Sequence, residues 1–421
     1  MFTDTQKQWS VLTMNTVAFA TNFAVWTMFS IIGIGIKQDL GLNETQFGIL
    51  VATPILTGSI TRLPLGIMTD RFGGRIVFFI QMLLVAIPTY GLAFATDYWH
   101  FLVIGLFVGL AGGSFAIGIA YTSAWFDEKR QGTAMGIFGA GNAGAAITNL
   151  VAPTIVIAYG WEMVPKVYSV AMLVMAIIFW FFTFNDPQHE ARKKSGKHIS
   201  LKEQLKPLKE IRVWRFGLYY YFVFGGFVAL ALWLPKYYVG EYDLDLKTAS
   251  FITMCFTLPS GLIRALGGWL SDKYGARTIN WAVFWVSLVC LFFVSYPQTT
   301  MIIHGIEGEV QLGVGVSLWA FTLLVFVVGI AMGIGKASVY RIIHDYYPNN
   351  MGSVGGMVGV IGGLGGFSLP IIFGIASDTI GVRSSCFMVL FALVGICMIL
   401  MHFAIKRLEA EKGIVPNQHI A

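Results

Sequence analysis

Long apolar stretches, one after another, constrain the fold of this 421-residue chain more than any other feature. A helix needs about 20 apolar residues to cross the hydrocarbon core of a bilayer. Only 12% of the residues are charged, against about 25% in soluble domains. The sequence therefore predicts an all-α membrane protein with twelve transmembrane helices. The predicted spans are residues 10–36, 45–69, 74–95, 99–126, 130–159, 162–185, 213–240, 248–271, 278–298, 315–344, 351–376 and 383–406.

Lysine and arginine are distributed unevenly between the predicted loops, and this predicts the orientation. If both termini lie in the cytoplasm, twenty of the 28 basic residues are cytoplasmic and five are external, as the positive-inside rule requires. The net charge of +6 then reflects topology and not nucleic-acid binding. We expect a multi-pass protein of a bacterial cell membrane, with both termini cytoplasmic and no cleavable signal peptide.

Three basic residues remain deep inside predicted spans: Arg62, Arg264 and Lys336. All 22 acidic residues fall in loops or at span ends. Charges at such depth are costly and usually face a cavity or a partner. Because no acid is available there, an anionic ligand is the natural counter-charge. The alternative is that the side chains snorkel to the cytoplasmic interface.

The chain repeats itself. At an offset of 202, the matched residues are Arg62, Gly66, Asp70, Gly73 and Arg75 with Arg264, Gly268, Asp272, Gly275 and Arg277. At an offset of 220, they are Gly132, Gly136 and Gly139 with Gly352, Gly356 and Gly359. We therefore expect two pseudo-symmetric six-helix bundles, residues 1–185 and 213–421, the second with a short cytoplasmic tail. A cytoplasmic linker over 186–212 joins them; its short amphipathic helix and basic residues contact lipid or, alternatively, form a regulatory site.

Repeated six-span halves are typical of transporters whose site lies near the bilayer midplane. Each deep arginine precedes an aspartate by eight residues, which is about 12 Å of helix. Half of the hydrocarbon thickness is about 15 Å. If Asp70 and Asp272 lie at the cytoplasmic boundary, both arginines approach the membrane centre.

The pattern G-x-x-x-D-[RK]-x-G-x-R occurs once in each half and resembles the loop motif of the major facilitator superfamily. The resemblance implies gating roles for Asp70 and Asp272. Each is expected to meet a helix N-terminus and cationic neighbours and to hold the cytoplasmic side closed. The motif carries no information about the substrate.

Glycine is concentrated in two segments, GTAMGIFGAGNAG at 132–144 and GSVGGMVGVIGGLGG at 352–366. Close helix packing is one explanation; we also expect these helices to line a narrow path for a small solute. Together with the paired arginines, GAGNAG and GGLGGF resemble the nitrate/nitrite porter family of that superfamily, over essentially the whole chain. The resemblance implies the major facilitator fold, with two bundles that rock around a central site.

The resemblance also implies a set of substrate-binding residues. They are Arg62, Arg264, Asn142, Tyr220, Phe115 and Phe224. The arginines would clamp the anion, Asn142 and Tyr220 would donate hydrogen bonds, and the phenylalanines would cover its faces. Planar guanidinium suits the planar nitrate ion. Core packing for the phenylalanines and a helix–helix hydrogen bond for Asn142 are the alternatives.

Lys336 resembles the branch of the family that is associated with proton-driven nitrate uptake. Burial and two nearby arginines disfavour the protonated lysine, and an incoming anion favours it again. Anion and proton would then bind cooperatively. The alternatives are that Lys336 reaches a membrane surface or only adds to the positive field.

We therefore expect a secondary active transporter that takes up nitrate with protons by alternating access. Nitrate/nitrite antiport and nitrite export are the alternatives, and an anion channel fits the repeated gate motifs less well. Four scattered cysteines and seven histidines form no catalytic or metal-binding pattern, so we expect neither an enzyme nor a cofactor. The expected partners are nitrate or nitrite, protons and lipid, and we expect a functional monomer.

Overall fold

The computed structural model describes residues 3–126, 128–185, 209–347 and 351–411. Nearly all of them are helical. Most of the predicted linker, with its predicted amphipathic helix, lies outside the described residues, and so does the chain after residue 411.

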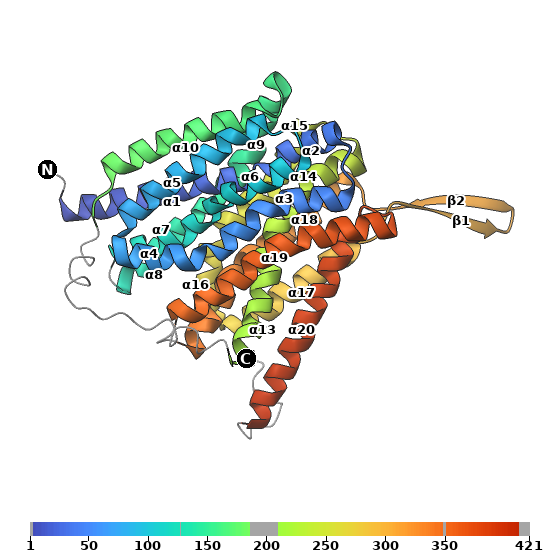
Figure 1. Ribbon diagram of the computed structural model, residues 1–421. Coiled ribbons are helices and arrows are strands. Elements are labelled where there is room, and N and C mark those ends of the chain that lie inside the picture. The colour runs from blue at the N-terminus through green and yellow to red at the C-terminus, as the bar shows by residue number, and fades with distance from the viewer. Residues whose placement is uncertain (1–2, 127, 186–208, 348–350, 412–421) are drawn as a thin grey trace.

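In the first half of the chain, long helices lie side by side (Figure 1). Their bounds are α1 Asp4–Thr27, α2 Phe29–Leu40, α3 Glu44–Ile60, α4 Arg62–Phe72, α5 Gly74–Gly91, η1 Leu92–Phe94, α6 Tyr98–Val108, η2 Gly109–Gly113, α7 Ser114–Ser123, α8 Glu128–Gly139, η3 Ala140–Ala143, α9 Gly144–Tyr159 and α10 Met163–Phe182.

The second half repeats this arrangement and adds a two-stranded hairpin that projects beyond the helices (Figure 1). Its elements are α13 Ile211–Tyr220, η5 Tyr221–Gly225, α14 Gly226–Tyr242, α15 Leu246–Leu262, α16 Arg264–Tyr274, α17 Ala276–Val294, β1 Thr299–Gly305, β2 Gly308–Val314, α18 Leu318–Tyr346, α19 Met351–Ile380 and α20 Ser385–Glu411. We call the end of the molecule that carries the hairpin the hairpin end. The opposite end, where α10 ends and α13 begins, is the linker end.

The predicted spans correspond to helices in the structure. Among the described residues, eleven helical runs are long and apolar enough to cross a membrane, and α15 with α16, bent by 46°, completes the twelfth. Large apolar side chains face outward on many of them, including Ile157, Phe181 and Trp319. A bilayer requires such a surface. The all-α membrane fold predicted from the sequence is confirmed.

The sequence windows left residues 299–314 between two spans without any element. The structure forms the antiparallel hairpin there, with Thr299 opposite Val314 and Gly305 opposite Gly308. Gly308 turns the chain with φ 138°, a conformation that favours glycine. A search for long apolar runs does not detect a hairpin of two seven-residue strands.

The repeat at an offset of 202 extends to the backbone. Thr61 (φ −72°, ψ −11°) and Ile263 (φ −65°, ψ −10°) interrupt their spans at matched positions. Gly73 (φ 88°) and Gly275 (φ 85°) end the following helices in the left-handed region, where glycine is favoured. The first span of each half is also the most deeply buried, with 83% and 89% of the apolar window inside. The two halves are therefore related by pseudo-symmetry.

The halves meet most tightly at the hairpin end, between α3 and α19. A Cβ atom added at Gly48 would lie 2.3 Å from the Pro370 carbonyl oxygen, and one at Gly374 would lie 2.4 Å from the Glu44 carbonyl oxygen. Glycine permits this backbone contact because it has no side chain. Toward the linker end, a Cβ atom at Gly268 or Gly356 would meet no atom within 4 Å.

Candidate functional site

The two deep arginines occupy equivalent positions in the fold. Arg62 is the first residue of α4 and Arg264 is the first residue of α16, and each follows the helix interruption described above. Arg62 is 7% exposed. Arg264 is half-buried, so the sequence repeat places two arginines at equivalent positions, one from each half, with unequal burial.

The other predicted binding residues also lie at or beside departures from regular α-helix. Phe115 follows the 3₁₀ turn η2, and Asn142 lies within the 3₁₀ turn η3. Tyr220 ends α13, and Phe224 lies in the π-helical segment η5. Such segments within helices often mark functional sites because they change the direction of side chains and free backbone groups.

Arg62 contacts three aromatic rings, of which Trp26 is the most distant at 5.9 Å. Its guanidinium carbon is 5.2 Å from the centroid of Phe115 and 5.1 Å from that of Phe224. The guanidinium carbon of Arg264 is 5.9 Å from the same Phe115 centroid and 5.7 Å from that of Tyr340. The two arginines therefore share one ring, with favourable cation–π contacts on either side.

Tyr220 connects Phe224 with Tyr340. Its ring stacks on Phe224 at 5.2 Å with an interplanar angle of 7°, and it meets Tyr340 edge to face at 5.0 Å. Each of the six side chains thus contacts the next. We call this set the arginine–aromatic ring; its members are Arg62, Phe115, Arg264, Tyr340, Tyr220 and Phe224.

Two glycines that are matched by the sequence repeat contact the two arginines, each from the opposite half. Arg62 Nη1 donates to the carbonyl oxygen of Gly359 at 3.1 Å. A Cβ atom added at Gly139 would lie 3.6 Å from Cδ of Arg264. Gly139 and Gly359 are matched by the offset of 220, so the arginine of each half packs against the equivalent glycine of the other half. Both glycine-rich segments lie beside the site as well as in helix packing.

Polar atoms around the arginine–aromatic ring are left without partners. Arg62 Nε is buried with no acceptor, and Asn142 Oδ1 is buried with no donor, although Asn142 Nδ2 donates to the Gly139 carbonyl oxygen at 3.0 Å. The Tyr220 hydroxyl forms no hydrogen bond of ordinary geometry, although the Tyr340 hydroxyl is its near neighbour. Buried polar groups are nearly always paired. Of these atoms, Arg62 Nε and the Tyr220 hydroxyl are donors and suit an anion with several acceptor oxygens; Asn142 Oδ1 is an acceptor and does not.

No acid neutralises the arginines within the described part of the chain. Neither Arg62 nor Arg264 forms an ion pair with a described residue, and Arg62 donates its one described hydrogen bond to a neutral carbonyl. A buried cation without a partner is strongly unfavourable. The site is therefore chemically prepared for a small anion.

Lys336 lies close to the arginine–aromatic ring but is not part of it. It is fully buried in the regular helix α18. Its Nζ atom donates to Ser260 Oγ at 3.2 Å and lies 3.5 Å from the centroid of the Phe227 ring. Arg264 is the charged neighbour that acts on it electrostatically. The structure places Lys336 in the interior, so it does not reach a membrane surface as the sequence alternative allowed.

The predicted gating residues are placed only in part. Asp272 Oδ1 pairs with Arg341 Nε at 2.7 Å. This cationic neighbour belongs to α18 of the same half, so the ion pair does not join the two halves. Asp70 belongs to α4, and its side chain lies outside the described residues.

Sequence analysis missed Tyr340 and Ser260. Tyr340 follows Lys336 by four residues and is one turn away on the same helix face, which is the signal that could have identified it. Its hydroxyl donates to the Gly355 carbonyl oxygen at 3.0 Å, within the second glycine-rich segment. Ser260, the partner of Lys336, carries no pattern that separates it from other small residues of its span.

Comparisons with known proteins agree with this geometry. A family model described as Major Facilitator Superfamily matches residues 15–316. A solved structure described as a bacterial homolog to the human lysosomal transporter Spinster, in an inward-facing and occupied conformation, has a TM-score of 0.70. It is 14% identical and covers 95% of this chain and 97% of that chain. At this identity the likeness shows the fold, and it confirms the predicted major facilitator fold.

Curated relatives are similar over nearly their whole length. The "Probable nitrate/nitrite antiporter NarK1" of Thermus thermophilus is 41% identical over 96% of this chain and 93% of its own. The "Nitrite extrusion protein" of Bacillus subtilis is 30% identical over 90% of both. The "Probable nitrate transporter NarT" of Staphylococcus aureus strain RF122 is 30% identical over 96% of this chain and 97% of its own. This chain belongs to the nitrate/nitrite porter family of the major facilitator superfamily.

Proposed function

We propose that this protein transports nitrate across a membrane by binding it between Arg62 and Arg264. The observation that carries the proposal is the arginine–aromatic ring, in which one arginine from each half contacts the same Phe115 ring. Neither arginine has an acidic partner among the described residues. A bound anion would supply the missing negative charge at the junction between the halves.

The chemistry of nitrate fits these groups. Nitrate is planar and spreads its charge over three oxygens, which suits the planar donors of guanidinium. The Tyr220 hydroxyl offers an additional neutral donor, and Asn142 Nδ2, which gives one hydrogen to the Gly139 carbonyl oxygen, has a second hydrogen to donate. The rings of Phe224 and Phe115 both contact Arg62 and would provide flat walls for a flat ion. The relatives whose names refer to nitrate and nitrite support this substrate class.

We further propose that Lys336 carries the proton that accompanies nitrate inward. It is buried beside Arg264 with Ser260 as its hydrogen-bond partner. An anion at the arginines would favour protonated Lys336, and by reciprocity protonated Lys336 would favour the anion. Importing one negative charge against the membrane potential costs about 2.3 kcal/mol per 100 mV. One proton cancels that cost.

The test is nitrate uptake and proton movement in proteoliposomes, with Lys336→Gln compared with wild type. Lys336→Gln should lose accumulation driven by a pH gradient but keep exchange of nitrate for nitrate, because exchange of like for like needs no proton. Lys247→Gln is the matched control, because Lys247 is exposed at the start of α15, and it should behave as wild type. If Lys336 only adds positive field, nitrate binding will weaken but uptake will stay coupled. Undiminished uphill uptake by Lys336→Gln would remove Lys336 from the mechanism.

Exchange of external nitrate for internal nitrite is the second candidate. The names of two relatives, a probable nitrate/nitrite antiporter and a nitrite extrusion protein, favour it. Nitrite loaded inside wild-type proteoliposomes should then accelerate nitrate entry without a pH gradient. Acceleration by a pH gradient but not by internal nitrite supports the first candidate.

A further inference from the structure

A second cluster of positive charge lies at the linker end of the second half, apart from the arginine–aromatic ring. Arg212 and Arg215 belong to α13, and Arg277 belongs to α17. The three side chains are close enough to act on one another electrostatically. None of them forms an ion pair or hydrogen bond with another described residue. Arg212 and Arg215 are half-buried and Arg277 is exposed, so the cluster offers three positive charges to an anion at the surface.

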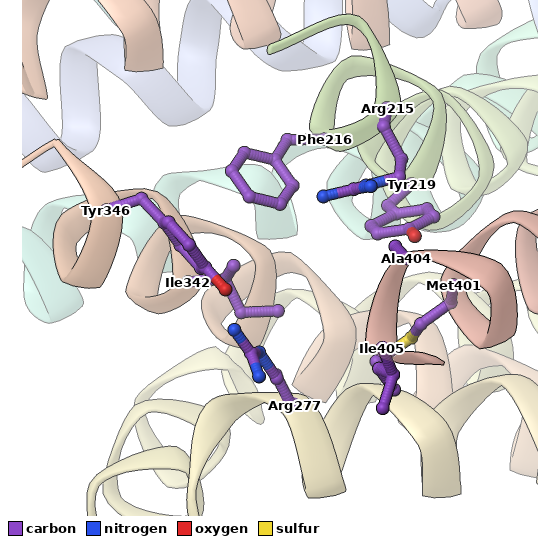
Figure 2. A pocket seen from close by; sticks show the side chains of 9 residues that line it. All are labelled: Arg215, Phe216, Tyr219, Arg277, Ile342, Tyr346, Met401, Ala404 and Ile405. Atoms are coloured by element: carbon purple, nitrogen blue, oxygen red, sulfur yellow. The ribbon is translucent and has the colours of Figure 1, made fainter. Parts of the chain in front are cut away.

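Two of these arginines line a small pocket between α13, α17, α18 and α20 (Figure 2). Figure 2 shows Arg215 and Arg277 entering from opposite sides, with Tyr219 and Tyr346 beside them. The pocket holds about 20 Å³, which is room for about one water-sized group. It can therefore receive one oxygen atom of an anion while the rest of the ligand stays at its mouth.

Buried donors in this pocket lack acceptors. Arg215 Nε and the Tyr219 hydroxyl are both buried without a hydrogen-bond partner, and Tyr219 is 2% exposed. Such groups are nearly always paired in native proteins. A charged oxygen between the two arginines would accept from both donors. Like the central site, the pocket contains buried donors without acceptors, but it lies at a different place in the fold.

The first half of the chain supplies an internal comparison. Arg75, which matches Arg277 at the offset of 202, donates from Nη2 to the Trp180 carbonyl oxygen at 2.6 Å and lies 4.3 Å from the Trp180 ring centroid. Arg277 lies 5.3 Å from the Tyr346 ring centroid and finds no acceptor among the described residues. The protein satisfies Arg75 in part, since its Nε atom remains buried without a partner, whereas Arg277 is exposed and its guanidinium is open to a ligand.

We infer that the pocket lies at the level of membrane headgroups, because three of its helices begin or end beside it. Arg215 is four residues from the start of α13, Arg277 is the second residue of α17, and Tyr346 ends α18. Trp214 and Ile211 beside it are exposed, and tryptophan is typical of the membrane–water interface. The nearest acid that acts on Arg277 is Asp345. That residue is half exposed and lies 3.6 Å from Arg341, so its single charge does not balance the three arginines.

We propose that this pocket binds the phosphate group of an anionic lipid, with one phosphate oxygen between Arg215, Arg277 and the Tyr219 hydroxyl. Guanidinium pairs with phosphate through short, charge-assisted hydrogen bonds. Basic pockets between membrane helices select anionic headgroups in this way. A zwitterionic lipid carries the same phosphate, but its own ammonium group competes with the arginines.

The test uses the purified full-length protein in detergent. Phosphatidylglycerol is added in mixed micelles, and bound lipid is counted by native mass spectrometry beside the shift in melting temperature. Arg215→Gln with Arg277→Gln should bind phosphatidylglycerol about tenfold or more weakly than wild type, because two charged hydrogen bonds are lost. Phosphatidylcholine should bind wild type weakly. Arg215→Lys with Arg277→Lys should retain part of the binding, because lysine keeps the charge without the planar donors.

Lys406→Gln is the matched control, because Lys406 is an exposed cation on α20 next to the lining residue Ile405. It should bind phosphatidylglycerol as wild type does. Gel filtration confirms that each variant is folded. If the double glutamine variant is not folded, the proposal is tested with the Arg215→Lys, Arg277→Lys variant and with the comparison of the two lipids in wild type. Equal binding of both lipids to wild type would overturn the proposal. So would an arginine-dependent response to inorganic phosphate without one to lipid, which would indicate a site for soluble phosphate.

Discussion

Arg62 contacts three aromatic rings and Arg264 contacts two, and this geometry depends on the shape of guanidinium. Lysine would keep the charge but lose the planar face and the bidentate donors. We predict that Arg62→Lys or Arg264→Lys weakens nitrate binding by about tenfold or more, the cost of losing a charged hydrogen bond. Calorimetric titration of nitrate into the purified variants measures this change. Cys255→Ala, on the exposed face of α15, should bind as wild type; wild-type affinity in a folded arginine variant would rule out the clamp.

Substitutions of Tyr340 can test the contribution of its ring and that of its hydroxyl separately. Its ring contacts Arg264 and Tyr220, and its hydroxyl donates to Gly355. We predict that Tyr340→Ala weakens nitrate binding, because it opens the arginine–aromatic ring, whereas Tyr340→Phe keeps most of the affinity. The same titration measures both variants. Equal losses would instead assign the effect to the hydrogen bond, and no loss in either would place Tyr340 outside the site.

The sequence was informative about the cations and less so about the rings. Arg62, Arg264 and Lys336 could be identified because a charge within an apolar span is rare and costly. Tyr340 could not, because it is one of sixteen tyrosines and an aromatic residue in an apolar helix is ordinary core material. Its position depends on how α18 packs against α13 and α16, and this is set by tertiary structure.

At the scale of the element, hydropathy predicted where helices cross the membrane but not where they depart from regular geometry. About twenty apolar residues in a row predict a membrane-spanning helix. The segment must be helical because lipid offers no hydrogen-bond partners for its backbone groups. The interruptions at Thr61 and Ile263 and the π-helical Tyr221–Gly225 each change only a few dihedral angles. Local sequence encodes such small differences weakly, and contacts between the halves select them.

Glycine between α3 and α19 permits an element-scale test. A Cβ atom at Gly48 would lie 2.3 Å from a backbone oxygen of Pro370, which cannot move aside as a side chain can. Overpacking costs about 1–3 kcal/mol, so Gly48→Ala should lower the population with a closed hairpin end by roughly 5- to 150-fold. We predict that nitrate transport falls accordingly in proteoliposomes while the protein remains folded.

Gly395→Ala is the control for this substitution, because a Cβ atom there meets nothing within 4 Å and helix propensity improves. It should transport as wild type. Normal transport by Gly48→Ala would show that the contact between α3 and α19 is not part of the cycle.

At the scale of the whole molecule, the structure is closed at the hairpin end. Asp378 at the end of α19 caps the N-terminus of α3: it accepts from the backbone N–H groups of Glu44 at 3.2 Å and Thr45 at 2.8 Å. Glu44 also pairs with Lys37 of the first half and Lys236 of the second. These contacts join the two halves. In an alternating-access cycle they must separate while the linker end, where Gly268 and Gly356 have room, closes.

Because the Asp378 cap joins the two halves at the closed hairpin end, we predict that Asp378→Asn shifts the protein toward a state that is open at that end. A carboxylate at a helix N-terminus is stabilising by about 1 kcal/mol, and the amide keeps only one acceptor oxygen. The shift should therefore be about fivefold. Spin labels on Asn43 and Thr379, both exposed and in different halves, report the separation in a protein without its native cysteines. The label distance should lengthen in Asp378→Asn without nitrate, and a saturating ligand that favours the closed state should shorten it again.

Asp97→Asn is the matched control for the loss of charge. Asp97 is exposed at the same end, and its ionic neighbour His100 belongs to the same half, so the substitution removes a carboxylate without touching the contact between the halves. Its label distances should equal those of the parent protein. If Asp378→Asn also leaves the distances unchanged, the cap does not help to close the hairpin end. The close packing of α3 against α19 and the Glu44 ion pairs would then be sufficient, and Gly48→Ala would remain the substitution that opens it.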